Sequence, residues 1–378
     1  MGIYEELGVR RLINASGTNT VVGGSLMPEP VLEAMADAAR SYVTLRDLQD
    51  RAGERIAELV GVEAALVSSG AAGGIALAAA ACITGGNWDR IYRLPDTSGL
   101  KNEIVVAQSE RPNYMYQAAE HVGGNLVHVG TPEEVTPEDF AAAIGSKTAA
   151  VLLIVATLDR SRMASPRVTA TVESVARLAK AAGVPVLVDA AAELPPAANF
   201  RAFLEMGADV VIFSGGKAIR GPQGTGLVLG RRDLVAAAAM NNNPYSAIGR
   251  PMKVGKEEIA GLVRAVELYV ARDEAAEMRA WESAARLVAE MLVGAPGIRA
   301  EVVRGGLYAR PPGMPVCAVH LDDGIGLSRD EVLRRLRQSD PPIAAGQIPG
   351  GLFVNPMTLS VGEEQVVARQ LLAVLAAR

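Results

Sequence analysis

Lys217 lies in a setting that a surface lysine does not need. The segment from Ile212 to Gly230 reads IFSGGKAIRGPQGTGLVLG, so the lysine follows an apolar run and is surrounded by small residues. At the end of a buried strand, a lysine can have a lowered pKa and act as an amine nucleophile. A lysine in such a place can also extend its ammonium group to solvent, so its role depends on the residues near it.

Asp189 is a second residue that chemistry could use. It closes the segment VPVLVDA, which is apolar up to the carboxylate. A carboxylate is costly to bury alone, so this one needs a helix N-cap, an ion pair or a cationic ligand as partner. Because Asp189 lies one predicted strand before Lys217, we expect both at the carboxyl ends of strands, where doubly wound sheets bind ligands.

A third signal is the run Ser69, Gly70 and Ala71, between the apolar segment AALVS and an Ala-rich helical stretch. Small residues let the N–H groups at a helix start approach an anion, and the helix dipole favours negative charge there. An ordinary strand-to-helix turn with a serine N-cap has the same sequence. We name these three residues the phosphate cradle.

The combination of lysine, acid and cradle meets the needs of pyridoxal 5′-phosphate. The lysine would hold the cofactor as a Schiff base, and the acid would keep the pyridine nitrogen protonated, so that the ring draws electrons from a carbanion. Ser214 would add a hydroxyl to the phosphate site, and Ala191 is small enough to pack beneath the ring. The sequence therefore predicts an enzyme with Lys217 as the cofactor anchor.

These residues need a sheet to position them. Short apolar runs alternate with helical patterns, as in EIVVAQ from Glu103, AAVLLIVA from Ala149 and DVVIFS from Asp209. Strands that are apolar throughout, each followed by a helix, predict an α/β fold with a mostly parallel, doubly wound sheet. We expect an N-terminal segment (1–45), a large cofactor-binding domain (46–255), a long connecting helix (256–295) and a small C-terminal α/β domain (296–378). For the small domain, the predicted order is strand, strand, helix, strand, helix.

The composition argues against several classes of protein. The 378 residues carry a net charge of −5, which does not favour a nucleic-acid partner. Two cysteines and three histidines, not clustered, predict neither a disulfide framework nor a metal site. No apolar run approaches the roughly 20 residues of a membrane span. We expect a cytoplasmic enzyme acting on a small molecule.

Several motifs also resemble a known family. INASGTNT, YVTLRDLQDRAGERIAELVGVEAALVSSGAA, RLPDTSG, VDAAAELPP, GADVVIFSGGKAIRGPQGTGLVLG and SAIGRPMKVGKEEIAGL are similar to the selenocysteine synthase-like branch of fold-type I pyridoxal-phosphate enzymes. That branch includes D-glucosaminate-6-phosphate ammonia-lyase and L-seryl-tRNA selenium transferase. The resemblance implies an aspartate aminotransferase-like fold, a homodimer or higher homo-oligomer, and Gly249 and Arg250 as contacts to the neighbouring subunit's cofactor phosphate.

The sequence departs from this family's pattern at two places that bear on the substrate. Where relatives of the ammonia-lyase type carry a histidine that stacks on the ring, this chain has Glu110, while Arg111 and Tyr114 match the rest of the pattern. Either Tyr114 or another group would stack on the ring. A C-terminal arginine of the family is replaced by Met357. The remaining candidates to bind an acidic substrate group are Arg11, Arg111, Arg220 and Arg310.

The resemblance implies α,β-elimination from a β-hydroxy amino acid or amino-sugar acid, such as D-glucosaminate or its 6-phosphate. Lys217 would remove the α-proton as general base, and Tyr114 or Glu110 would protonate the leaving hydroxyl. Racemisation or epimerisation remains an alternative, because Glu110 could act as a second base. Selenium-transferase-like replacement remains another, although the acidic chain does not favour binding of tRNA. A non-catalytic protein would need neither Lys217 nor Asp189.

Overall fold

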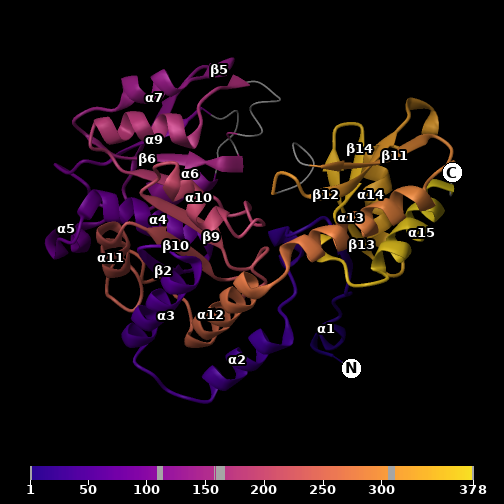
Figure 1. Cartoon of the computed structure of the whole chain (residues 1–378), viewed down its shortest axis with the longest axis horizontal. Helices are drawn as coiled ribbons and strands as arrows, with labels where there is room; N and C mark the ends of the chain where they lie inside the picture. Colours follow the sequence, from indigo (N-terminus) through magenta and orange to yellow (C-terminus); the bar gives the residue numbers. More distant parts are fainter. Residues whose placement is uncertain (1, 109–113, 157, 159–166, 305–310, 377–378) are drawn as a thin grey trace. The chain divides into compact units, whose positions relative to one another are not determined.

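The computed structural model describes residues 2–108, 114–156, 158, 167–304 and 311–376 (Figure 1). They form two compact units. The larger unit is Met27–Arg272, and the smaller unit combines Met1–Leu26 with Asp273–Arg378.

A seven-stranded sheet forms the centre of the larger unit. Its spatial order is β2-β10-β9-β8-β6-β3-β4. The strands are β2 (Ala64–Ser68), β3 (Glu103–Ala107), β4 (Asn125–Val129), β6 (Thr148–Ile154), β8 (Val186–Asp189), β9 (Val210–Ser214) and β10 (Gly226–Gly230). Only β10 runs antiparallel to its neighbours β2 and β9. Strand β6 is buried at every position, as expected for a parallel strand that is covered on both faces.

One face of this sheet is covered by helices around α4 (Gly70–Thr84). Helix α4 contacts five of the strands and three further helices, α5 (Trp88–Arg93), α6 (Tyr114–Glu120) and α11 (Arg232–Asn241). It is apolar all round and almost wholly buried, which explains its run of alanines. Ile154, Leu187 and Ile212 belong to the apolar core around α4. Because side chains alternate along a strand, every second residue from these also points to the α4 face.

The opposite face is covered by α10 (Asn199–Glu205), α12 (Lys256–Ala271) and α9 (Val172–Ala181). Phe213 packs edge-on against Phe200, with ring centroids 5.1 Å apart, and Phe200 packs against Tyr269 at 5.6 Å. Helices α2 (Glu29–Ala39) and α3 (Leu45–Val60) pack on α12. Helix α7 (Pro137–Ala143) packs on α9, near the parallel pair β5 (Glu134–Val135) and β7 (Arg167–Val168). Both faces of the sheet are therefore covered.

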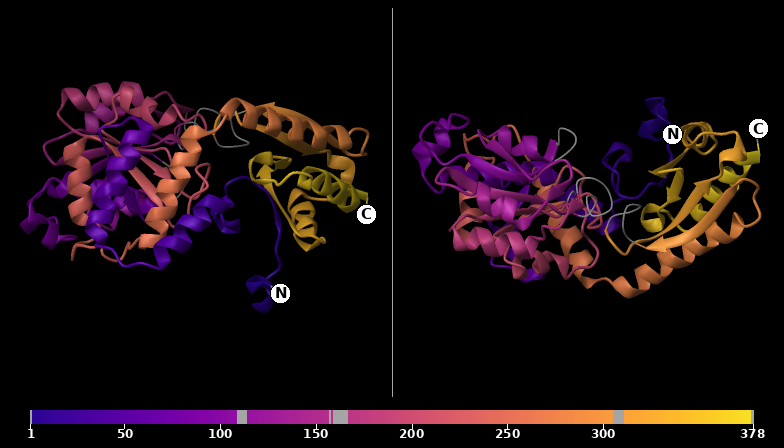
Figure 2. Two further views of the ribbon diagram at one scale, coloured as in Figure 1. Left: turned by 60° about the horizontal axis from the view of Figure 1, so that its bottom comes forward. Right: turned by 90° about the horizontal axis from the view of Figure 1, so that it is seen from above.

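The smaller unit has a five-stranded sheet of order β1-β13-β14-β12-β11. Its strands are β1 (Ile13–Ala15), β11 (Ile298–Arg304), β12 (Pro315–Leu321), β13 (Ile343–Ile348) and β14 (Gly351–Val354). A single apolar core joins this sheet to α13 (Glu274–Met291), α14 (Arg329–Gln338) and α15 (Glu363–Ala376), and Figure 2 shows α13 lying along the sheet. Short elements complete the chain: α1 (Ile3–Glu6), η1 (Thr20–Val22), η2 (Asp323–Ile325) and η3 (Pro356–Thr358).

The structure differs from the expected order of elements in three places. The single helix expected over residues 256–295 is two helices, because Arg272 is extended and the Asp273 side chain caps α13 by accepting from the N–H of Ala276 at 2.9 Å. The single strand expected before the last helix is the pair β13–β14. The N-terminal segment contributes β1, which pairs parallel with β13. The predicted domain limits themselves stay a prediction.

Two general features concern ligands and membranes. Among the described residues, no helix has both the length and the apolar composition needed to cross a bilayer. Nor does the described part of the chain bring three or more His, Cys, Asp or Glu side chains together in a group suited to a metal ion.

Candidate active site

The predicted site residues of the larger unit lie at the carboxyl ends of neighbouring strands. Asp189 ends β8, and Lys217 follows the end of β9, the strand paired with β8. Asp189 is in register with Ile154 and Ile212, which both belong to the α4 core. The Asp189 side chain therefore points to the α4 face, and so does Ser214, two residues after Ile212.

The Asp189 carboxylate is buried and held in place. Asp189 as a whole is only 4% exposed. Oδ1 accepts a hydrogen bond from the N–H of Ala191 at 2.9 Å, so Ala191, which is half-buried, fixes the carboxylate through its backbone. A fixed, buried carboxylate is suited to hold a cationic group, such as a protonated ring nitrogen.

A tight turn carries Lys217, which is half-buried. The N–H of Gly215 donates to the carbonyl of Thr225 at 2.8 Å, and the N–H of Gly221 donates to the carbonyl of Gly215 at 2.9 Å. A Cβ on Gly216 would lie 2.4 Å from the Cα of Gln223, so only glycine permits this close return of the chain. The turn ends at Arg220, a half-buried residue with a φ of 58° that is unusual outside glycine. The backbone thus fixes where the lysine leaves β9.

The phosphate cradle is the turn from β2 into α4. Gly70 has a φ of 68°, and the Ser68 hydroxyl donates to the Gly70 carbonyl at 3.0 Å. The Ser69 side chain makes no capping hydrogen bond with the helix. The first N–H groups of α4, beginning with Gly70 and Ala71, have no partner within the helix and can bind an anion. The backbone of Gly226 packs closely against the cradle, because a Cβ on Gly226 would lie 2.4 Å from the carbonyl carbon of Gly70.

The loop after α11 lies against α4. The N–H of Gly249 donates to the Asn241 carbonyl at 2.8 Å, and a Cβ on Gly249 would lie 2.7 Å from Cδ2 of Leu77. Gly249 is buried by these contacts and Arg250 is exposed. The predicted contact of Gly249 and Arg250 with a neighbouring subunit's phosphate stays a prediction, since the structure contains one chain.

The remaining predicted residues do not add to this site among the described residues of the larger unit. Glu110, Arg111 and Arg310 lie outside the described residues. Tyr114 begins α6 and is 69% exposed. Arg11, in the smaller unit, forms an ion pair with Glu5 at 2.9 Å, and Met357 in that unit is buried.

Sequence reasoning missed Tyr116. Tyr116 is 2% exposed, and its hydroxyl has no hydrogen-bond partner among the described residues. An unsatisfied buried hydroxyl costs about 1–3 kcal/mol. Burial, and after it the negative charge of Asp189, raise the pKa of the Tyr116 phenol. The spacing of Tyr114 and Tyr116 in NYMYQAAEH does not show that the first tyrosine is exposed and the second buried.

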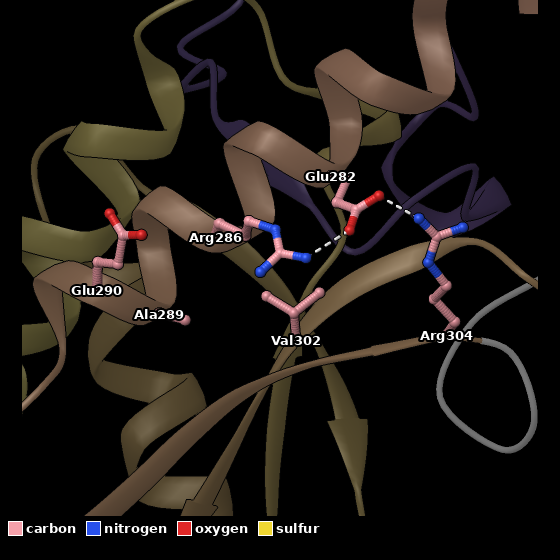
Figure 3. A pocket seen from close by; sticks show the side chains of 6 residues that line it. All are labelled: Glu282, Arg286, Ala289, Glu290, Val302 and Arg304. Carbon is pink, nitrogen blue, oxygen red and sulfur yellow. Dashed lines mark hydrogen bonds and ion pairs between the residues drawn. The ribbon is translucent and has the colours of Figure 1, made fainter. Parts of the chain in front are cut away.

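A pocket of the smaller unit lies between α13 and β11. Figure 3 shows Glu282 of α13 between Arg286 and Arg304. Glu282 accepts from Arg286 at 2.7 Å and also pairs with Arg304, and with Glu290 the lining holds two acidic and two basic side chains. This pocket has no predicted catalytic residue in its lining.

The residues at the strand ends fit pyridoxal 5′-phosphate. Asp189 is a fixed buried acid, Lys217 is an amine in the turn that follows the adjacent strand, and the phosphate cradle leaves backbone donors available. When bound, this cofactor withdraws electrons from the α-carbon of an attached amino acid and makes its α-proton acidic.

Comparison with known proteins agrees with this choice of cofactor. The family model described as L-seryl-tRNA selenium transferase matches residues 12–281. This chain belongs to that family. The 5′-C-glycyluridine monooxygenase-decarboxylase of a Streptomyces species is 35% identical over 97% of this chain and 90% of its own length. D-glucosaminate-6-phosphate ammonia lyase of Salmonella typhimurium is 31% identical, with coverage of 98% and 96%.

Comparison with solved structures identifies the fold. A structure of D-glucosaminate-6-phosphate ammonia-lyase superposes with a TM-score of 0.83 at 31% identity, covering 100% of this chain and 98% of that one. Aspartate aminotransferase of Thermus thermophilus has a TM-score of 0.57 at 16% identity, with coverage of 97% and 99%, and shows the fold alone. The expected fold-type I architecture is confirmed. The predicted cofactor is confirmed as that of the family, so the protein is a pyridoxal-phosphate-dependent enzyme.

Proposed function

We propose that this protein is an ammonia-lyase that eliminates a β-hydroxyl group from an amino acid or amino-sugar acid. The observation that carries the proposal is the placement of Asp189 and Lys217 at the carboxyl ends of the paired strands β8 and β9. The ammonia lyase of Salmonella typhimurium, 31% identical over 98% of this chain, supports the choice of reaction. D-glucosaminate or its 6-phosphate is the substrate to test first.

In this proposal the residues of the site have distinct tasks, and Lys217 has two. The phosphate cradle and the Ser214 hydroxyl bind the cofactor phosphate through hydrogen bonds. Asp189 holds the protonated ring nitrogen, with its carboxylate oriented by the N–H of Ala191. Lys217 anchors the cofactor and, once the substrate amine has replaced it, its Nζ accepts the α-proton.

The leaving hydroxyl needs a proton, which Tyr114 or Glu110 would donate. Loss of water from the substrate leaves an enamine, and hydrolysis of the released enamine returns one water and yields a 2-oxo acid and ammonia. Arg111, Arg220 and Arg310 are candidates to bind the acidic groups of the substrate, because a guanidinium donates two parallel hydrogen bonds to a carboxylate or phosphate.

A second candidate is oxidative decarboxylation at the same α-carbon. It is favoured by the 35% identity to a protein named 5′-C-glycyluridine monooxygenase-decarboxylase, over 97% of this chain. That reaction would also rely on Lys217 and Asp189. It differs in consuming dioxygen and releasing carbon dioxide instead of forming ammonia and a 2-oxo acid by elimination.

One assay separates these reactions. The purified protein with its cofactor is incubated with β-hydroxy amino acids, D-glucosaminate, its 6-phosphate and 5′-C-glycyluridine, while ammonia, 2-oxo acid and dissolved oxygen are followed. Ammonia and 2-oxo acid in equal amounts, without oxygen uptake, support the lyase. Oxygen uptake with release of carbon dioxide supports the second candidate. Exchange of the α-proton without either product would contradict both and favour a racemase or epimerase.

We further propose that the protein acts in the cytoplasm as a homodimer or a higher homo-oligomer. Support comes from large apolar side chains that stay exposed near the N-terminus of the single chain, including Leu7 at 67%, Leu26 at 78% and Tyr42 at 102%. Both cysteines are free, in agreement with a reducing compartment. Light scattering coupled to size-exclusion chromatography measures the assembly directly, and a monomeric mass would contradict the oligomer.

A further inference from the structure

The turn that carries Lys217 rests on helix α12. The hydrogen bond from the N–H of Gly221 to the carbonyl of Gly215 closes this turn around the lysine. A Cβ on Gly215 would lie 2.7 Å from Cδ1 of Leu262, and a Cβ on Gly221 would lie 3.1 Å from the same atom. Leu262 belongs to α12 and is fully buried. Both ends of the closed turn therefore pack directly against this helix.

One face of α12 is directed at the turn. Ala265, on the same face as Leu262, has its Cβ 3.3 Å from where a Cβ on Gly221 would lie. Positions 262, 265, 269 and 272 follow one another at intervals of three or four residues, the spacing of a single helix face. Tyr269 therefore continues this face, and so does Arg272, which follows the last residue of the helix.

The guanidinium of Arg272 contacts both the helix and the turn. Its Cζ lies 3.7 Å from the centre of the Tyr269 ring, and stacking on an aromatic ring restricts the plane of a guanidinium. Tyr269 is itself buried and packs edge-on against Phe200. Nη1 of Arg272 donates a hydrogen bond of 3.4 Å to the carbonyl of Ala218. All four residues belong to the larger unit, so this connection is formed within it.

We propose that Arg272 is a positioning residue for Lys217. Ala218 is buried and directly follows the lysine, so a hydrogen bond to its carbonyl restricts the backbone from which the Lys217 side chain extends. A small displacement of a reacting group has a large effect on bond formation. Arg272 acts through the backbone of the turn, without a contact to cofactor or substrate. This inference rests on the proposed role of Lys217 as the cofactor anchor.

The test compares two ligands that differ only in the group to which Lys217 binds. Apoprotein is titrated by calorimetry with pyridoxal 5′-phosphate and with 4′-deoxypyridoxine 5′-phosphate, in which a methyl group replaces the aldehyde and no Schiff base can form. We expect Arg272→Met to raise the apparent Kd for pyridoxal 5′-phosphate about fivefold, the effect of losing one hydrogen bond. The Kd for the analogue should change less than about twofold, because the phosphate cradle and Asp189 are not altered.

Arg264→Met is the matched control, since Arg264 lies on the exposed side of the same helix and pairs with Glu267 at 2.8 Å. It should leave the Kd for both ligands unchanged. In a Lys217→Ala background, Arg272→Met should no longer change the Kd for pyridoxal 5′-phosphate, because the amine that it positions is absent. Thermal unfolding of each apoprotein reports on folding. If Arg272→Met does not fold, Arg272→Lys, which keeps the charge but lacks the planar group, is titrated with the same expectation.

Three results would overturn the inference alone. An unchanged Kd for pyridoxal 5′-phosphate would mean that the turn does not need Arg272. An equal rise in Kd for both ligands would mean that Arg272 supports the fold of the whole site. An effect of Arg272→Met that persists in the Lys217→Ala background would mean that Arg272 acts independently of the lysine. Equal affinity of the parent protein for cofactor and analogue would instead contradict the role of Lys217 as anchor, and this inference with it.

Discussion

The two units bury polar side chains to very different extents. Among the described residues, the smaller unit buries one polar side chain, Asn355, and the N–H of Met357 donates to it at 2.9 Å. The larger unit buries eleven: Gln49, Ser68, Thr84, Thr97, Thr148, Asp189, Glu193, Thr225, Asn241, Asn242 and Asn243. Buried polar groups cost stability unless they are paired. The smaller unit is built as an ordinary core, while the larger unit retains polar groups that packing alone would not keep.

The difference indicates which buried polar residues are candidates for a catalytic or cofactor-binding role. In the larger unit, Asp189 lies at the end of an apolar strand, and Tyr116 keeps a buried hydroxyl that has no hydrogen-bond partner among the described residues. A fold selected only for stability would replace both by apolar residues. The comparison therefore predicts that changes in the larger unit's strand ends affect cofactor and catalysis, and that core changes in the smaller unit affect stability.

The largest effect is expected from Lys217→Ala. Without the amine, the cofactor loses its anchor and the α-proton loses its acceptor, so turnover should fall below detection and the visible absorbance of the bound cofactor should disappear. The assay is ammonia release together with an absorbance spectrum. Lys180→Ala on the exposed surface of α9 is the control and should behave like the parent protein. Turnover of Lys217→Ala at the parent rate would mean that Lys217 is not part of the catalytic site.

Asp189→Asn should come next in size. The amide keeps the shape but loses the charge that holds a protonated ring nitrogen, so kcat should fall by about 10³-fold or more while the anchor at Lys217 still forms. Single-turnover kinetics with substrate, and the absorbance spectrum of the bound cofactor, measure the two properties separately. A variant with parent kinetics would mean that another acid serves the cofactor.

Leu371→Ala examines the smaller unit. Leu371 on α15 is fully buried in that unit's core, and its truncation should lower the free energy of unfolding by about 2–5 kcal/mol. Chemical denaturation gives this value. The folded fraction should keep the parent's cofactor absorbance. Loss of that absorbance in fully folded protein would break the contrast between the units.

Gly226→Ala should have the smallest of these effects. The new Cβ would lie 2.4 Å from the Gly70 carbonyl carbon, so the phosphate cradle must shift. We expect the apparent Kd for pyridoxal 5′-phosphate to rise about tenfold, with a stability loss of about 1–3 kcal/mol from overpacking. Gly145→Ala is the control, because its Cβ would meet no atom within 4 Å. Equal cofactor affinity in both variants would mean that the cradle does not bind the phosphate.

The sequence is a good guide to the larger unit's sheet and a poor one to some of its details. AAVLLIVA is apolar at every position, and DVVIFS is apolar between its polar ends, because both faces of their strands are buried, and this pattern predicts β6 and β9 directly. That β10 runs antiparallel cannot be read from TGLVLG, since burial alone does not set strand direction. Strand β1 is three residues long, and it forms by pairing with β13 at the other end of the chain, so no local pattern marks it.

The same holds for the site. Lys217 and Asp189 could be placed at strand ends because each interrupts an apolar segment. The burial of Tyr116 could not be predicted, because it arises from the packing of α6 against α4, which brings together residues from separate parts of the chain. The break between α12 and α13 could not be predicted either. An Arg-Asp pair does not by itself mark the end of a helix, and it is the side chain of Asp273 that caps the start of α13.

The most direct test of the central claim is to find the lysine that carries the cofactor. Purified protein saturated with pyridoxal 5′-phosphate is reduced with borohydride, digested, and analysed by mass spectrometry. The account predicts a single cofactor-derived mass addition, on the peptide that contains Lys217. An addition on a different lysine, such as Lys180 or Lys253, or no addition to saturated protein, would contradict it.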